Sequence, residues 1–243
     1  RAARAATLPR RESRLGFMIA TVQLVDLGPA GTLRAITRRP KPGDTPGLRS
    51  AQVAVFAPLA LSGPPPVSRA GLIAFWDDHD AYDRFLDGDP IGKRFAGGFQ
   101  ARLRPLRAHG SWPGLPADVP QSRSVEHDGP AVVLTLARLR ISQVVRFLRA
   151  SRPAERAALE SDGMIWGSAA VRLPFVATVS IWQDARLAAT YAYGRQQPAH
   201  SHAIREQQRK DFHRQSAFIR FAPTRLEGSL GGSNPLVAAE IAT

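Results

Sequence analysis

The sequence has 243 residues, no cysteine and a formal net charge of +13 at pH 7. The missing cysteine excludes disulfides, thiolate metal sites and cysteine nucleophiles, and no apolar run approaches the roughly 18 residues that span a bilayer. Arginine carries almost all of the positive charge and is spread over the whole length without a zinc-finger, RNP-like or basic-zipper motif. This distribution argues against nucleic-acid binding and favours a solvated surface. We expect a cytoplasmic protein, with peripheral attachment to an acidic membrane surface left open.

Composition divides the chain into two similar units. Residues 1–15 are basic and lack the apolar stretch of a secretory signal, so we expect a disordered tail there. The segment 113–128 is rich in proline and predicts a linker between a first unit, 16–112, and a second unit, 129–228. The glycines that follow the second unit predict a flexible C-terminal tail over 229–243.

The two units repeat the same order of apolar runs, which indicates an internal duplication. A helix-like stretch follows the first run of each unit and ends at an Arg-Pro pair, Arg39-Pro40 or Arg152-Pro153. The runs predict strands over 17–27, 51–61, 71–76 and 101–105 in the first unit, and over 131–139, 163–171, 175–182 and 219–223 in the second.

The third strand of each unit ends in a tryptophan, Trp76 or Trp182, and leads into a second helix. Asp78 and Asp184 are expected N-caps, because a short side-chain oxygen can accept a free N–H of the first turn. Each unit therefore has the order β-α-β-β-α-β of a ferredoxin-like domain. We predict an α+β fold of tandem ferredoxin-like repeats that form a dimeric-α/β-barrel-type fold. A monomer that closes its own barrel and a homodimer both remain open.

The second unit carries about twelve extra residues before its last strand, around 196–212, with no counterpart in the first unit. If Pro198 opens a helix there, His200 shares a face with Ile204, whereas His202 faces solvent. Because this addition breaks the symmetry of the duplication, we expect a functional site at His200.

Three roles for His200 fit these residues. It can be a hydrogen-bonded core residue, which is the commonest role of an inward-facing histidine. It can be an axial ligand of haem iron, since haem needs only one protein ligand, or a general base, which needs a carboxylate partner. Glu206 and Asp211 fall on other faces of the predicted helix, and the i,i+2 spacing argues against a zinc site shared with His202.

Several short blocks within residues 130–225 resemble, in order, the spheroidene monooxygenase family of carotenoid-modifying enzymes. The sequence AVVLTLARLR over 131–140 is similar to one strand of that family. The other blocks are ATVSIW over 177–182, Tyr191-Ala-Tyr193, His200 followed by Ile204, then Phe212, and FIRFAP over 218–223.

The resemblance implies a dimeric α+β-barrel-type fold and a haem-dependent monooxygenase that acts on an apolar, carotenoid-like substrate in carotenoid biosynthesis. It places His200 at the haem iron and Arg220 where a planar cationic fork suits a haem propionate. Arg102, at the equivalent place in the first unit, instead suggests a plain outward-facing strand residue. The resemblance also makes four aromatic residues candidates for the wall of the substrate pocket, although each is equally suited to the core: Trp182, Tyr191, Tyr193 and Phe221.

Two positions depart from the family pattern. Ala169-Ala170-Val171-Arg172 stands where the family has a glutamate before its ATFSLW block, and Leu136 stands where it has an arginine. If that glutamate takes part in oxygen activation or holds the cofactor, activity is altered or lost. Two alternatives therefore accompany the oxidoreductase hypothesis. One is a non-enzymatic α+β barrel protein that binds haem or another apolar ligand, and the other is a basic protein that binds membrane or nucleic acid.

Overall fold

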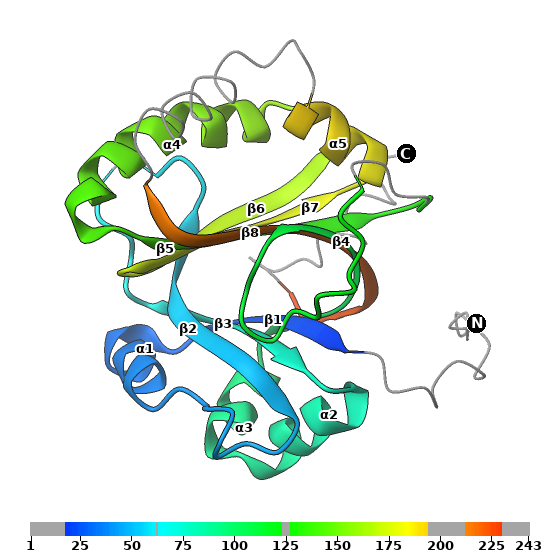
Figure 1. Ribbon diagram of the computed structural model, residues 1–243. Helices are drawn as coiled ribbons and strands as arrows, with labels where there is room; N and C mark the ends of the chain where they lie inside the picture. The colour runs from blue at the N-terminus through cyan, green and yellow to red at the C-terminus, as the bar shows by residue number, and fades with distance from the viewer. Residues whose placement is uncertain (1–17, 62, 123–126, 194–211, 230–243) are drawn as a thin grey trace, which may run out of the picture.

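The computed structural model describes residues 18–61, 63–122, 127–193 and 212–229. Eight antiparallel strands close into one barrel in the order β1-β3-β2-β6-β7-β5-β8-β4, with the helices packed outside it (Figure 1). The first half supplies β1 (Ile19–Asp26), β2 (Leu48–Pro58), β3 (Arg69–Trp76) and β4 (Phe99–Gly110). The second half supplies β5 (Ala131–Leu139), β6 (Met164–Arg172), β7 (Phe175–Trp182) and β8 (His213–Glu227).

The helices lie on two opposite sides of the barrel (Figure 1). Those of the first half are α1 (Gly28–Thr37), α2 (His79–Gly88) and α3 (Pro90–Ala96). Those of the second half are the 3₁₀ turn η1 (Ile141–Gln143), α4 (Val144–Leu159) and α5 (Ala185–Tyr193). The predicted tandem ferredoxin-like fold is therefore confirmed, and one chain closes the barrel. Among the described helices, none combines the length and apolarity that crossing a bilayer requires.

The two halves meet at two strand pairs, β2 with β6 and β4 with β8. In the second junction Arg107 on β4 pairs with Arg220 on β8. Because side chains alternate between the two faces of a strand, each junction aligns residues of both halves on the outer surface of the barrel as well as in its interior.

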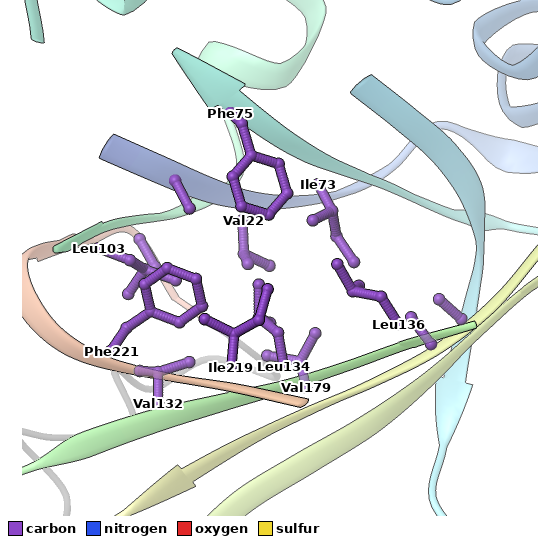
Figure 2. Close-up of a cluster of buried hydrophobic side chains, with 14 of the residues drawn as sticks. Val22, Ile73, Phe75, Leu103, Val132, Leu134, Leu136, Val179, Ile219 and Phe221 are labelled. Carbon is purple, nitrogen blue, oxygen red and sulfur yellow. The ribbon is translucent and has the colours of Figure 1, made fainter. Parts of the chain in front are cut away.

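The interior of the barrel is an apolar core. Alternate residues of every strand point inward, among them Val22, Phe75, Leu103, Leu134 and Phe221 (Figure 2). Val119, from the segment predicted as a linker, and Trp112 just before it are buried against the same core, and Ser50 Oγ donates a hydrogen bond to the carbonyl of Pro113 in that segment. This part of the segment therefore packs against the barrel.

Both expected N-caps are present. The Asp78 carboxylate accepts a hydrogen bond from Ala81 N at 2.7 Å at the start of α2, and the Asp184 carboxylate accepts one from Arg186 N at the start of α5. The tryptophans before them are almost fully buried, with Trp76 0% and Trp182 2% exposed.

The predicted end of the helix after β5 is wrong. The sequence pattern ends it at Arg152-Pro153, whereas α4 runs through Pro153 to Leu159. Proline removes one backbone donor and crowds the preceding turn, but the residues after it, Ala-Glu-Arg-Ala-Ala-Leu, are strong helix formers. Pro153 is also exposed, and the Tyr191 hydroxyl donates a hydrogen bond at 2.7 Å to the Ala154 carbonyl just beyond it.

Candidate functional site

The layer of side chains between the sheet and the helices is buried to a different extent in the two halves. In the first half this layer is a continuous buried cluster that includes Trp76, Tyr82, Phe85 and Phe95. In the second half the buried cluster consists of smaller groups around Phe212, namely Ala137, Leu139 and Val176. Four other outward side chains in the middle of β5 and β7 are only half-buried: Val133, Thr135, Thr178 and Ser180. We call this side of β5, β7 and β8, together with the adjoining edge of β4, the outer face of the second half.

Two buried arginines occupy one end of this outer face. Arg107 is 4% and Arg220 7% exposed, and they are direct partners on neighbouring strands. Their Nε atoms are buried and have no hydrogen-bond partner among the residues that the structure describes. Arg107 donates hydrogen bonds to the hydroxyl of Tyr193 and, at 3.5 Å, to the carbonyl of Gln121. In the described part of the chain, no carboxylate forms an ion pair with either arginine.

The electrostatic environment of Arg220 reflects this arrangement. Burial lowers the pKa of its guanidinium and the neighbouring charge of Arg107 lowers it further, whereas Tyr193 acts in the opposite direction. Two like charges thus lie side by side where water is largely excluded, a position that favours an incoming anion.

Trp182 and Tyr191, two of the predicted pocket residues, lie together between the sheet and α4. Their ring centroids are 5.4 Å apart, and Trp182 Nε1 donates a hydrogen bond to Ser180 Oγ at 2.9 Å. Burial, followed by the charge of Glu155, raises the pKa of Tyr191 to about 12, so its hydroxyl stays protonated. The pair forms a fixed aromatic wall that also connects α5 to α4 through the hydrogen bond to Ala154.

The other two predicted pocket residues lie elsewhere. Tyr193, at the end of α5, is 49% exposed and contacts Arg107, with the guanidinium carbon 5.7 Å from the ring centre. Phe221 is fully buried inside the barrel (Figure 2). Because Phe221 directly follows Arg220 on β8, the two side chains point to opposite faces of the strand. The structure therefore groups Arg220 with Tyr193 and separates both from Phe221.

His200 and its neighbour His202 fall within 194–211, outside the described residues. The nearest described histidine, His213, begins β8 and lies edge-on to Phe147, with ring centroids 5.5 Å apart. In the parts of the chain that the structure describes, no group of three or more His, Asp or Glu side chains is arranged to hold a metal ion.

Arg107 is the site residue that sequence reasoning did not identify. Its only sequence signal is the duplication, which aligns Arg107 in the first half with Arg225 in the second. That alignment does not say which residue Arg107 faces, because the contact with Arg220 arises from the pairing of β4 with β8 across the two halves.

Comparison with known proteins supports the family resemblance, although no protein-family model matches the sequence. The chain is 30% identical over 225 residues to spheroidene monooxygenase of Rubrivivax gelatinosus, covering 88% of this chain and 85% of the relative. It is 29% identical over 174 residues to spheroidene monooxygenase of Rhodobacter capsulatus, covering 69% and 71%. Among solved structures, an aldoxime dehydratase crystallised with butyraldoxime shares the fold at a TM-score of 0.54 and 9% identity, over 90% of this chain and 85% of that one. The chain belongs to the spheroidene monooxygenase family.

Proposed function

We propose that this protein is a haem-dependent monooxygenase acting on an apolar, carotenoid-like substrate at the outer face of the second half. The observation that carries the proposal is the 30% identity to a spheroidene monooxygenase over most of both chains. The incompletely buried layer beside Trp182 and Tyr191 supports this location. Apolar ligands bind preferentially to concave surfaces lined by aromatic groups with a few fixed polar groups.

The described residues fit the acidic edge of a haem. The buried Nε of Arg220 has no partner in the described chain, and a guanidinium suits the planar two-oxygen geometry of a propionate. We assign Arg220 to this role and His200, outside the described residues, to the iron. A neutral imidazole suits haem iron, which needs one protein ligand.

Haem, when bound, supplies the activation of dioxygen, for which protein side chains have no equivalent. In a monooxygenase reaction one oxygen atom enters the substrate and the other leaves as water, so an external reductant supplies two electrons together with two protons. The protein's own part is to bind and orient. Tyr191, half-buried and packed against the buried Trp182, presents an aromatic surface, and the raised pKa of Tyr191 keeps its hydroxyl neutral beside an apolar ligand.

The two departures from the family pattern do not lie on this surface. Ala170 and Leu136 are both fully buried in the barrel interior, on the opposite side of the sheet from Arg220 and Trp182. Their small or apolar side chains complete the apolar barrel core. The missing glutamate therefore leaves the residues assigned to the outer face unchanged.

A membrane surface as the source of an apolar substrate is part of the same proposal. Ile141 and Val145 are each 62% exposed and Leu148 41% exposed, one helical turn apart along η1 and α4. Arg146 and Arg149 flank this stripe, and basic amphipathic helices bind anionic bilayers in this way. Sedimentation with anionic vesicles should be weakened by Val145→Ser with Leu148→Ser, and equal sedimentation of both proteins would contradict this part of the proposal.

Haem titration tests the proposed function directly. The wild-type protein should develop a Soret band that His200→Ala abolishes and that the matched control His202→Ala retains. The loaded protein, supplied with a reductant, ¹⁸O₂ and spheroidene, should incorporate one labelled oxygen atom per product. A band without incorporation would favour a non-enzymatic haem-binding protein. Absence of the band, or a band unchanged in His200→Ala, would overturn the haem assignment.

A further inference from the structure

The duplication places a pair of arginines at each end of the β4–β8 junction. Arg102 pairs with Arg225 at one end and Arg107 pairs with Arg220 at the other. Arg102 lies opposite Thr21 on β1, and Arg220 lies opposite Val133 on β5, at matching positions of the two ferredoxin-like halves. The two pairs are therefore related by the internal symmetry of the barrel. Arg225 is 59% exposed whereas its counterpart Arg107 is buried, so the matched comparison is between Arg102 and Arg220, each 7% exposed.

The first-half pair is neutralised by carboxylates. Arg102 donates two hydrogen bonds to Asp83 on α2, at 3.1 and 2.6 Å, and its guanidinium carbon lies 4.8 Å from the ring centre of Tyr82. Arg225 forms an ion pair with Glu227 at 2.6 Å. Each arginine of this pair thus has its own counter-charge within the protein.

The second-half pair has no carboxylate at either equivalent position. Ala189 follows the N-cap of α5 by the same number of residues as Asp83 follows that of α2, so a methyl group stands at the position equivalent to the Asp83 carboxylate. His109 stands two residues after Arg107, where Glu227 stands after Arg225. The two halves therefore share both arginines, but only the first-half pair has the two acidic groups.

Keeping the arginines without their carboxylates is unfavourable for the protein alone. Taking a charge out of water is strongly unfavourable unless a partner compensates it, and two adjacent cations add their mutual repulsion. Arg102, Arg107 and Arg220 are all more than nine-tenths buried, each with an Nε that has no partner in the described chain. What distinguishes Arg107 and Arg220 is that no described carboxylate pairs with them, whereas Asp83 pairs with Arg102. An anion placed between the two guanidinium groups removes both penalties together.

We propose that Arg107 and Arg220 form a single anion-binding site for a carboxylate group, to which each half of the duplicated chain contributes one arginine. Two planar forks on adjacent strands present donors to both oxygens of such a group. The Tyr193 hydroxyl, which accepts a hydrogen bond from Arg107, holds that guanidinium in place. The carboxylate belongs either to a haem propionate, in which case the inference rests on the proposed function, or to a free anion.

Three probes distinguish the two sources: haem, haem dimethyl ester, whose propionates are esterified, and inorganic phosphate. Affinity for the two porphyrins is measured by absorbance titration, and the effect of phosphate by the shift of the melting temperature at constant ionic strength. The variants are Arg220→Met and Arg107→Met, with Arg104→Met as the matched control, because Arg104 is an exposed arginine of the same strand as Arg107. Arg220→Lys serves as a variant that keeps the charge but loses the fork.

If a propionate occupies the site, wild type and Arg104→Met bind haem about tenfold more tightly than the ester. Arg220→Met and Arg107→Met then bind haem and its ester with equal affinity, and Arg220→Lys keeps part of the preference for haem. If a free anion occupies it, both porphyrins bind equally, but phosphate raises the melting temperature of wild type and Arg104→Met more than that of the two site variants. The proposal is overturned if the site variants match Arg104→Met with all three probes. His200→Ala, which tests the iron ligand, leaves the phosphate result unchanged, so the two proposals fail separately.

Discussion

Arg102 and Arg220 occupy symmetry-equivalent positions on β4 and β8, yet Arg102 donates two hydrogen bonds to Asp83, whereas no described carboxylate contacts Arg220. The same residue type in the same strand position is thus a structural ion pair in one half of the barrel and, among the described residues, a buried charge without a carboxylate partner in the other. Comparing the two positions separates the structural from the functional role of an arginine.

Replacing each arginine by methionine should have opposite effects on the stability of the ligand-free protein. Arg102→Met leaves Asp83 without its partner and should destabilise by about 1–2 kcal/mol, because the carboxylate is half exposed. Arg220→Met removes a buried charge and its repulsion with Arg107, so it should stabilise by about 1 kcal/mol. Urea unfolding of the three proteins in buffer free of polyvalent anions measures both changes. Equal destabilisation by the two variants would show that Arg220 is compensated within the protein.

Trp76 and Trp182 should each contribute strongly to the stability of the half of the barrel in which they lie. Both are nearly fully buried, and their indole N–H groups donate to Thr21 and Ser180, each at 2.9 Å. Trp76→Ala and Trp182→Ala should each destabilise by roughly 3–5 kcal/mol through the loss of buried surface and the cavity left behind. The free energy of unfolding from denaturant titration checks this, with the exposed Leu33→Ala as the control. A neutral result at either tryptophan would contradict its place in the core.

The N-cap hydrogen bond of α2 should contribute about 1 kcal/mol to the free energy of unfolding. Asp78→Ala removes the acceptor of the Ala81 N–H hydrogen bond and leaves a first-turn donor without its partner. Asp80→Ala is the matched control, since Asp80 lies in the same first turn and contributes through the helix dipole alone. Thermal unfolding should show a clear loss for Asp78→Ala and a loss of a few tenths of a kcal/mol for Asp80→Ala. Similar losses in the two variants would mean that the cap bond is not formed in solution.

Tyr191 should make stability fall at alkaline pH. Its pKa is raised from 10.0 to about 12 in the folded protein, mainly by burial, so the folded state holds the phenolic proton more tightly than the unfolded state does. The resulting stability is complete below pH 10 and is lost as the pH rises toward 12. Tyr191→Phe should cost about 1 kcal/mol at neutral pH, because it removes the hydrogen bond to Ala154.

Tyr191→Phe should also make the free energy of unfolding less dependent on pH in the alkaline range. Denaturant unfolding between pH 8 and 11 should show that the difference in stability between wild type and Tyr191→Phe narrows as the pH rises. Tyr82, whose pKa burial also raises, remains in both proteins and cancels in the comparison. A constant difference over the whole range would show that Tyr191 titrates normally.

The sequence by itself determined the duplicated fold, because the signals it depends on are local. Strand alternation, the tryptophan at the end of β3 and of β7, and the aspartates that cap α2 and α5 all act within a few residues, and the structure confirms each of them. A prediction from one residue was wrong where the residues around it favoured a different structure. Pro153 predicted a helix end, but the helix-forming residues after it and the contact from Tyr191 carry α4 to Leu159.

Only the tertiary structure decided how the candidate site is assembled. Arg107 and Arg220 are far apart in the chain and become neighbours because β4 pairs with β8 in one particular register. Phe221, next to Arg220 in sequence, is removed from the site because the barrel buries the opposite face of β8. Local preference fixes which residues form strands, but closure of the barrel decides which strands meet, and that long-range pairing determines which charges are compensated and which remain for a ligand.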